Sequence, residues 1–367
     1  MKLKPFTTIL SALLFTSTSL LCASAADKGD LDDSSMFAYQ TPADGKQRVI
    51  MPAAGPRVQE GADAFLTADF LYFEARQQGL QFAQTGIEAS TSGNPSLPEG
   101  KVFTQDYHYD PGVRVGLGLG LGHDAWDLFV QYTWFQQNPS KIVHTHTDNS
   151  LNTLQATSNM GFSTGSPLTY ASSSWKYRLN MADLELGRDS YFSKYLALRY
   201  FFGVRAAWQN QHFNTHYKWL DTSNANAETN TKIDQAMKIF AVGLRAGLNG
   251  SWFFTPNWSI FGNVSASTLA ARAKTTPKDT QFTTADSSTV TTNEYLEQKV
   301  SFIEPVLEMM IGFGWDLWFE DDGYHFGLKA GWEESIWISN NKFVTIGSQN
   351  HGDLAMQGFV LKARFDF

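Results

Sequence analysis

The stretch Phe359-Val360-Leu361-Lys362-Ala363-Arg364-Phe365-Asp366-Phe367 ends the chain and decides the fold. Every odd position carries an apolar side chain, and charged side chains stand at positions 362, 364 and 366. Because the side chains of a strand alternate between its two faces, one face of this strand is apolar and the other is charged. The pattern predicts a strand that separates lipid from water.

The same strand carries a candidate sorting signal. A terminal aromatic residue on an alternating strand resembles the signal by which bacterial outer-membrane barrels are recognised for assembly. Its candidate residues are Phe359, Leu361, Phe365 and Phe367. The alternative is an ordinary edge strand at the end of a soluble β-sandwich, and that alternative must also explain the N-terminus.

Residues 1–25 have the three parts of a secretory signal peptide. Lys2 and Lys4 precede an apolar run, and Ala23-Ser24-Ala25 supplies the small residues of a cleavage site. The single cysteine, Cys22, lies inside this segment, so the mature chain needs neither disulfides nor cysteine ligands. No later segment offers the roughly 18 consecutive apolar residues of a membrane-spanning helix.

Composition favours a secreted barrel over a soluble globule. Aromatic residues make up 14% of the chain and charged residues only 17%, whereas soluble domains carry about 25% charged residues. The net charge of -8 leaves no basic footprint for nucleic acid. We therefore expect residues 26–61 to form a polar periplasmic lead-in or plug segment and residues 62–367 to form a transmembrane β-barrel.

Ten segments alternate apolar and polar residues at period two. Tilted strands need about 9 to 11 residues to cross the lipid, and these segments are long enough. In the fourth, the run from Trp175 to Met181 is expected to point outward, and a change of phase before Leu184 predicts a bulge near Ala182. The segments are 62–75, 112–122, 124–135, 174–188, 196–208, 237–252, 258–271, 300–318, 324–334 and 353–367.

Short and long connections alternate strictly between these segments. Outer-membrane barrels have short turns on the periplasmic side and long loops outside, so both termini are expected in the periplasm. The fold predicted is an all-β antiparallel transmembrane barrel of the bacterial outer membrane with at least ten strands. Twelve to sixteen strands stay open, because the first two long connections could each hold a further pair. The short connections are 122–124, 189–194, 254–257 and 319–323.

Several of these strings are familiar. They resemble the Legionella-type major outer membrane proteins and the MOMP-like porins of environmental chlamydiae. The strings are Ala64 to Arg76 (AFLTADFLYFEAR), His123-Asp124-Ala125-Trp126-Asp127-Leu128, and Asp183 to Arg188 (DLELGR) running into Leu196 to Arg205 (LALRYFFGVR). This resemblance implies a pore-forming β-barrel. The missing cysteine is a departure from the MOMP proteins of pathogenic chlamydiae, which are cross-linked by disulfides, so a cross-linked coat is not expected.

Charged residues on the presumed inner faces are the candidate lumen and selectivity residues. In a porin, cations and anions on separate walls would set a transverse field across the lumen and orient polar solutes. The alternative is that these charges pair with one another and hold the barrel together. The cations are Arg114, Arg178, Arg199, Arg205, Arg245 and Lys329, and the anions, mostly on later strands, are Glu304, Glu308, Asp316 and Glu333.

Tryptophans on the outer faces are candidates for the two membrane interfaces, where aromatic side chains gather. They are Trp126, Trp134, Trp175, Trp208, Trp252, Trp258, Trp315 and Trp332.

Two motifs receive plainer interpretations. The glycines at 116, 118, 120 and 122 lie on one face of one strand, where they leave room for bulky neighbours, and no helix follows to make a phosphate loop. His144, His146 and Asp148 have metal-ligand residue types, but nothing else fixes a site and a solvated loop tip is expected.

An enzyme is the rival class. The acidic pair at 321–322 falls at a proposed periplasmic turn, the wrong end for an outer-membrane protease, and His212 and His216 near an external rim have no partner that the sequence assigns. No Gly-x-Ser-x-Gly nucleophile motif is present. We expect no catalytic residues, no metal and no cofactor.

The function predicted is an outer-membrane porin that allows passive diffusion of small hydrophilic solutes and ions through a charged lumen. The alternatives are a closed barrel that serves as an adhesin or structural envelope protein, and an outer-membrane hydrolase. Barrel diameter decides between them, since ten strands can be closed by their own side chains and sixteen leave a channel. Expected partners are outer-membrane lipid and lipopolysaccharide, the assembly machinery and small solutes, with a homo-oligomer left open and no nucleic acid.

Overall fold

The computed structural model describes residues 63–85, 100–121, 125–144, 151–155, 168–220, 228–285, 288–319, 323–345, 348–349 and 351–367. The predicted signal peptide and the predicted lead-in segment lie outside these residues. The described residues contain no helix that is long and apolar enough to cross a membrane.

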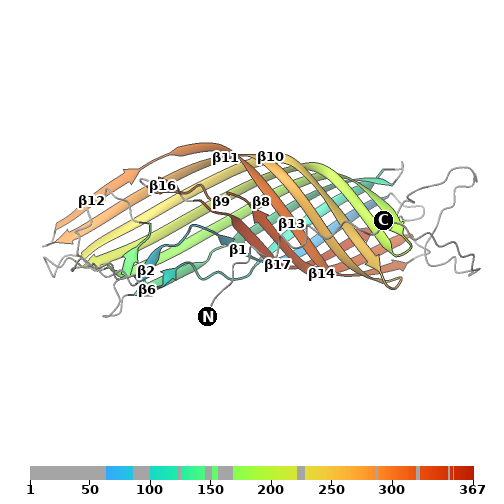
Figure 1. The fold of residues 1–367 in the computed structure, drawn as a ribbon, viewed down its shortest axis with the longest axis horizontal. Helices are drawn as coiled ribbons and strands as arrows, with labels where there is room; N and C mark the ends of the chain where they lie inside the picture. The colour runs from blue at the N-terminus through green and yellow to red at the C-terminus, as the bar shows by residue number, and fades with distance from the viewer. Residues whose placement is uncertain are drawn as a thin grey trace, which may run out of the picture. The chain divides into compact units, whose positions relative to one another are not determined.

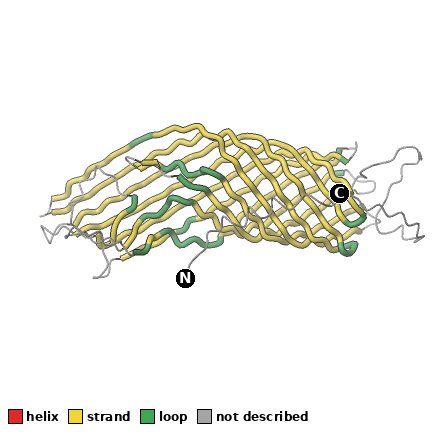
Figure 2. The backbone as a smooth tube through the Cα atoms, in the orientation of Figure 1, coloured by secondary structure: helices red, strands yellow, loops and turns green. Residues whose placement is uncertain are grey.

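Within the described residues, ten strands form a closed ring, and each pairs antiparallel with its neighbours along the chain (Figures 1 and 2). The ring closes where β1 pairs with β17. All ten predicted segments are strands of this ring, so the all-β barrel is confirmed. The ring strands are β1 (Ala64–Gln77), β4 (Asp110–Gly120), β5 (Trp126–Gln137), β8 (Leu168–Ser193), β9 (Leu196–Leu220), β10 (Glu228–Phe253), β11 (Trp258–Ala285), β13 (Gln298–Phe319), β14 (Tyr324–Trp337) and β17 (Leu354–Asp366).

Seven short strands lie in the long connections. β6 pairs with β8, and β12 pairs with the far end of β11, where Ser288 lies opposite Ala285. β2, β3 and β7 join the same sheet beside β8, and β15 pairs with β16. Their bounds are β2 (Ala83–Thr85), β3 (Val102–Phe103), β6 (Ser140–His144), β7 (Leu151–Thr153), β12 (Ser288–Tyr295), β15 (Val344–Thr345) and β16 (Ser348–Gln349).

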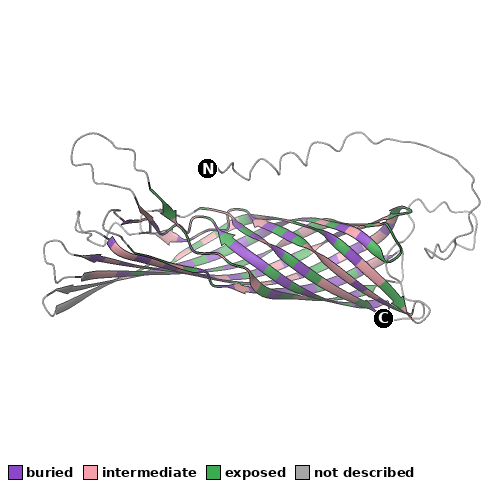
Figure 3. Cartoon of the chain, turned by 90° about the horizontal axis from the view of Figure 1, so that it is seen from below, coloured by how far each residue is buried: buried purple, intermediate pink, exposed green. Residues whose placement is uncertain are grey.

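The outer face of the ring is apolar along a broad band. Phe70 on β1, Val204 on β9 and Ile311 on β13 point outward and keep 47%, 45% and 66% of their surface exposed. Their sequence neighbours lie on the inner face and are buried or half-buried, as the alternating colours of the strands in Figure 3 show. An exposed apolar band of this extent would be unfavourable in water and suits contact with lipid.

Four neighbouring strands run far beyond this band. β8, β9, β10 and β11 have 26, 25, 26 and 28 residues and extend towards one end of the ring (left in Figure 1). Since about 9 to 11 residues cross the lipid, more than half of each strand lies outside it. These extensions occupy much of the segments 209–236 and 272–299, which the sequence assigned to loops.

In the extensions, the apolar side chains point inward instead of outward. Trp175, Tyr177 and Leu179 on β8 are fully buried, whereas Leu184 further along the same strand is exposed. Two expectations are therefore wrong: the run from Trp175 to Met181 does not face outward, and no bulge lies near Ala182. The register of β8 with β9 shifts only between Leu168 and Tyr170 and between Tyr191 and Ser193. We call this exchange of faces the polarity inversion. Its cause is the surroundings, because outside the lipid the outer wall meets water and apolar side chains are buried within the ring.

The glycine run on β4 makes room for aromatic side chains, as predicted. A Cβ atom at Gly118 would lie 2.0 Å from the ring of Phe65, and one at Gly116 would lie 2.6 Å from that of Phe129. The two rings stack against each other with centroids 5.5 Å apart. The described glycines of this run therefore serve packing, and Gly122 lies outside the described residues.

Candidate functional site

The interior of the ring is the candidate site, and its outer part is packed with apolar side chains. Trp175 stacks on Tyr177 with ring centroids 5.3 Å apart, and Phe135 lies 6.3 Å from Tyr177 and 6.1 Å from Phe73. The Tyr177 hydroxyl reaches Met356 Sδ on β17 at 3.8 Å, across the ring from β8. Side chains from opposite walls thus meet inside the barrel.

The first long connection contributes residues to this packing. Leu80 and Phe82 are buried, and the hydroxyl of Tyr217 on β9 donates to the Phe82 carbonyl at 2.6 Å. The Gln105 side chain donates to the Leu80 carbonyl at 3.1 Å and to Ser173 Oγ on β8 at 2.7 Å. The start and the end of this connection are therefore fixed to the inner wall.

The connection after β14 also enters the ring. Asn340 is fully buried, and its Nδ2 donates to Gln209 Oε1 on β9 at 2.9 Å and to Glu304 Oε1 on β13 at 2.6 Å. Its Oδ1 accepts from Gln211 Nε2 at 2.9 Å. Phe343 packs on Phe213 with ring centroids 5.9 Å apart. We call residues 338–343 the inward loop, because they link β14 to the β9 and β13 walls.

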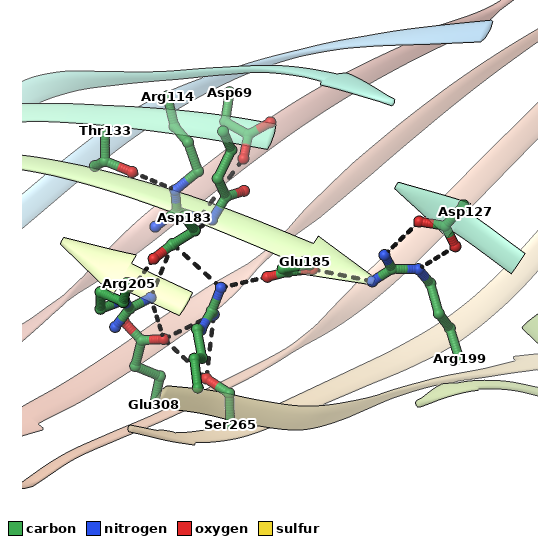
Figure 4. A network of polar contacts seen from close by, with 12 residues as sticks. Asp69, Arg114, Asp127, Thr133, Asp183, Glu185, Arg199, Arg205, Ser265 and Glu308 are labelled. Carbon is green, nitrogen blue, oxygen red and sulfur yellow. Dashed lines mark hydrogen bonds and ion pairs between the residues drawn. The ribbon is translucent and has the colours of Figure 1, made fainter. Parts of the chain in front are cut away.

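Below this packed region, charged side chains form a network across the interior (Figure 4). Arg205 on β9 is fully buried and holds Asp183 on β8 at 2.7 and 3.0 Å and Glu308 on β13 at 2.7 and 2.9 Å. Arg245 on β10 contacts the same two carboxylates at 3.2 and 2.8 Å and also contacts Glu185. Ser265 donates to Glu308 at 2.8 Å. The two arginines therefore connect β8 with β13 through paired, hydrogen-bonded charges.

Two further arginines extend the network. Arg199 makes two hydrogen bonds to Asp127 on β5, at 2.9 and 2.6 Å, and one to Glu185 at 3.1 Å. Arg114 on β4 makes two to Glu333 on β14, at 3.0 and 2.7 Å, and lies 3.6 Å from Asp69. The pairs of Arg199 with Asp127 and of Arg114 with Glu333 also join strands that are not neighbours in the ring.

Two lysines stand apart from these ion pairs. Lys329 on β14 lies directly opposite Lys362 on β17 in the strand register. Each ammonium group lies over an aromatic ring, Lys329 over Phe261 at 5.4 Å and Lys362 over Phe129 at 5.6 Å. Among the described residues, neither has a carboxylate within ion-pair distance. Asp316, the remaining predicted anion, binds His325 at 3.1 Å near the end of the barrel opposite the extensions.

One predicted lumen residue faces the wrong way. Arg178 on β8 is exposed on the outer wall, where its guanidinium donates to Gln136 Oε1 at 3.2 and 3.1 Å. The prediction is wrong because the apolar residues from Trp175 to Met181 were assigned to the outer face, which put Arg178 on the inner one. The structure places the other lumen candidates on the inner face: Arg114, Arg199, Arg205, Arg245, Lys329, Glu304, Glu308, Asp316 and Glu333. Their role in selectivity stays a prediction.

The sequence interpretation missed the carboxylates of the early strands. Asp183 and Glu185 on β8, Asp127 on β5 and Asp69 on β1 are buried beside the arginines. An unbroken period-two pattern through β8 would have placed Asp183 and Glu185 on the same inner face. Cations and anions are therefore mixed, and the paired arrangement, which was the alternative, describes the contacts that form.

The aromatic candidates also include one residue that the sequence assigned to the wrong face. Trp175 is corrected to the interior, where its Nε1 donates to Gln211 Oε1 at 3.1 Å. On the C-terminal strand, Phe359, Leu361 and Phe365 point outward, and Phe367 stacks on Phe365 at 6.1 Å. Their role in assembly is a separate prediction. The other tryptophans lie on the outer face, half-buried or exposed: Trp126, Trp134, Trp208, Trp252, Trp258, Trp315 and Trp332.

The enzyme and metal motifs find no assembled site in the described part of the chain. His212 is exposed on the outer wall of β9, and His216 lies near Asn230 Oδ1 at 3.2 Å. No described group of residues could hold a metal ion. His146, Asp148 and the acidic pair 321–322 lie outside the described residues.

Comparison with solved structures shows outer-membrane β-barrels. The outer membrane protease OmpT from Escherichia coli matches at 10% identity over 85% of this chain and 99% of its own, with a TM-score of 0.34. A Pseudomonas aeruginosa FadL homologue matches at 8% identity over 83% and 89%, with a TM-score of 0.27. The Yersinia pestis attachment invasion locus protein Ail matches at 9% identity over 66% and 99%, with a TM-score of 0.22. With TM-scores this low, none of them informs the function.

No curated protein matches the chain. One family does, and it covers almost all of the predicted mature sequence: residues 56–367 match the family described as the Legionella pneumophila major outer membrane protein precursor. The ring of antiparallel strands and the apolar outer band are what a protein of that membrane requires. The chain belongs to this family of bacterial outer-membrane β-barrel proteins.

Proposed function

We propose that this protein is a closed barrel that works as a surface-binding protein of the outer membrane. The observation that carries the proposal is the filling of the interior. The contact of the inward loop with β9, the contact between Tyr177 and Met356 and the arginines bound to Glu308 each join strands that are not neighbours in the ring. A ten-stranded barrel is narrow enough to be closed by its own side chains.

The extensions of β8 to β11 supply the surface on which such a protein would act. They form a continuous sheet outside the lipid, with β9 and β10 paired from Trp252↔Leu196 to Glu228↔Leu220. Outward side chains there are polar, among them His212 and Asn214 on β9 and Asp234 on β10. A rigid sheet presents such groups in fixed positions, which lowers the entropy cost of binding a partner.

A diffusion channel, the function predicted from the sequence, is the second candidate. The observation in its favour is that many charged side chains gather in the interior away from the extensions, with Lys329 and Lys362 free of ion pairs among the described residues. A polar wall of this kind is what a conducting lumen needs. In that case the inward loop would have to leave its contacts with Gln209 and Glu304.

Single-channel recording tests both candidates. The mature protein is refolded in detergent, inserted into a planar bilayer under a salt gradient, and compared with a variant in which residues 338–343 are replaced by a glycine-serine linker of equal length. The closed barrel is expected to give no conductance steps. Protease protection serves as the control that the protein has inserted. Discrete steps with a reproducible reversal potential in the unmodified protein would overturn the closed barrel and favour the channel.

Attachment of cells tests the binding surface directly. Bacteria that produce the barrel are compared with bacteria that produce a variant whose β9–β10 hairpin is shortened to a two-residue turn after Gln211, the register partner of Met237. We expect fewer attached cells for the shortened variant at equal surface amounts. Equal attachment on every surface tested, including protein-coated and abiotic ones, would contradict the binding role.

A further inference from the structure

A row of basic side chains crosses the outer wall of five neighbouring strands. In the strand register, Arg178 on β8 lies opposite Asn210 on β9, Asn210 opposite Lys238 on β10, Lys238 opposite Lys274 on β11, and Lys274 opposite Lys299 on β13. All four cations are exposed. We call these five residues the basic row.

The basic row borders the apolar band. Trp208 on β9 and Phe240 on β10 lie in the band on the same outer face, each two positions along its strand from the row. They are 41% and 46% exposed. On β13, Ile303 lies four residues from Lys299 and is 68% exposed. The row also coincides with the polarity inversion, because Tyr177 and Leu179 beside Arg178 point inward. The cations therefore lie where the outer wall leaves the lipid on the side of the extensions.

The contacts within the row leave positive charge unpaired. Two pairs of like charges stand directly opposite each other, Lys238 with Lys274 and Lys274 with Lys299, an arrangement that destabilises a sheet. Glu297 binds Lys274 and Lys299 at 2.9 Å each. Among the described residues, Lys238 has no ion-pair partner, and neither has Arg272, an exposed cation two positions from Lys274 on the same face. Positive charges that repel one another along one edge of the apolar band would be stabilised by an anionic partner bound at that edge.

We propose that the basic row and Arg272 bind the phosphate groups of lipopolysaccharide, the phosphorylated glycolipid of the outer leaflet. The partner must lie in the plane of the membrane beside the barrel, because the row faces sideways at the edge of the lipid band. Guanidinium groups bind phosphate oxygens through paired hydrogen bonds, and ammonium groups add charge. The proposal does not depend on whether the lumen conducts.

Binding to lipid A, the phosphorylated anchor of this glycolipid, tests the proposal. The refolded full-length mature barrel is titrated in detergent micelles with lipid A, or with the same lipid after removal of its phosphates, and both the affinity and the Tm are measured. The test variant is Arg178→Gln with Lys238→Gln and Arg272→Gln. The matched control is Lys194→Gln, which removes an exposed cation from the turn between β8 and β9, at the opposite end of the barrel.

The wild-type barrel is expected to bind the phosphorylated lipid more tightly and to melt at a higher temperature with it. Because a basic side chain near an anionic lipid surface contributes about 1 kcal/mol, each removed cation should lower the affinity about fivefold. The control should keep the wild-type affinity. Equal binding of both lipids by the wild type would overturn the proposal, and so would a folded triple variant with unchanged affinity. If the triple variant fails to fold, the single variant Lys238→Gln, which breaks no side-chain hydrogen bond or ion pair among the described residues, is measured in its place and should show the same fivefold loss.

Discussion

The variant Arg205→Met tests the structure against the interpretation of the sequence, with Arg178→Met as its matched control. The sequence assigned both arginines to the lumen. In the structure, Arg205 is fully buried with four contacts of 2.7 to 3.0 Å to Asp183 and Glu308, whereas Arg178 is exposed and, among the described residues, bonds only to the Gln136 amide.

The expected loss differs strongly between the two variants. Without Arg205, two buried carboxylates keep a single shared cation, Arg245, at 3.2 and 2.8 Å. Breaking a buried ion pair by removing one partner costs about 3 to 5 kcal/mol, whereas an exposed substitution changes stability by about 0.5 kcal/mol or less.

Urea unfolding in lipid vesicles, followed by tryptophan fluorescence, measures both free energies of unfolding. A second comparison uses Glu308→Gln. Since Glu308 and Arg205 contact each other directly, the loss in the double variant should be smaller than the sum of the two single losses. Equal stability of the Arg205 and Arg178 variants would refute the assignment of Arg205 to a buried network, and additive losses would refute the direct coupling.

Three further outcomes are expected. Trp175→Ala should lower the free energy of unfolding by about 3 to 5 kcal/mol, because it removes a fully buried ring and leaves a cavity beside Tyr177; urea titration measures it, and a neutral effect would place the ring in lipid. Deletion of Phe367 should reduce assembly into the outer membrane in cells, measured as heat-resistant folded protein, and undiminished insertion would remove its role as a signal. Burial raises the pKa of the Tyr107 hydroxyl from 10.0 to about 12, so its neutral form stabilises the fold below pH 10 and this contribution is lost as the pH rises through 12. The wild type should therefore lose more stability than Tyr107→Phe between pH 10 and 12. Equal losses of stability would contradict the burial of Tyr107.

The ring strands could be read from the sequence because lipid on one side and a polar interior on the other impose one repeating pattern. Val113 to Leu119 on β4 and Leu198 to Val204 on β9 follow it without interruption. The strictly alternating connection lengths then fixed the antiparallel order. These features are local, so period and spacing were enough to predict the ten strands and their neighbours.

The interior could not be predicted because its contacts depend on surroundings and on register. Trp175 was assigned to the lipid-facing wall because apolar side chains of a strand in the bilayer point outward. It lies instead in a part of β8 whose outer wall faces water. Arg178 was misplaced by the same step. The contact between Asn340 and Gln209 joins a loop to a distant strand, and no local pattern in Ile338 to Phe343 indicates it. Pairing of Arg205 with Glu308 likewise requires the ring to be closed.

The closing pair of strands sets a condition on how this molecule can fold. β17 pairs with β1 on one side and with β14 on the other, so the last strand of the ring along the described chain completes both seams. Before it is in place, β1 and β14 have unpaired edges, and backbone groups at such edges cannot stay unbonded in lipid. Contacts between distant chain segments also form slowly. Insertion of a closed ring must therefore wait until β17 has been made, and a ribosome that stops before β17 leaves a product without a stable place in the membrane.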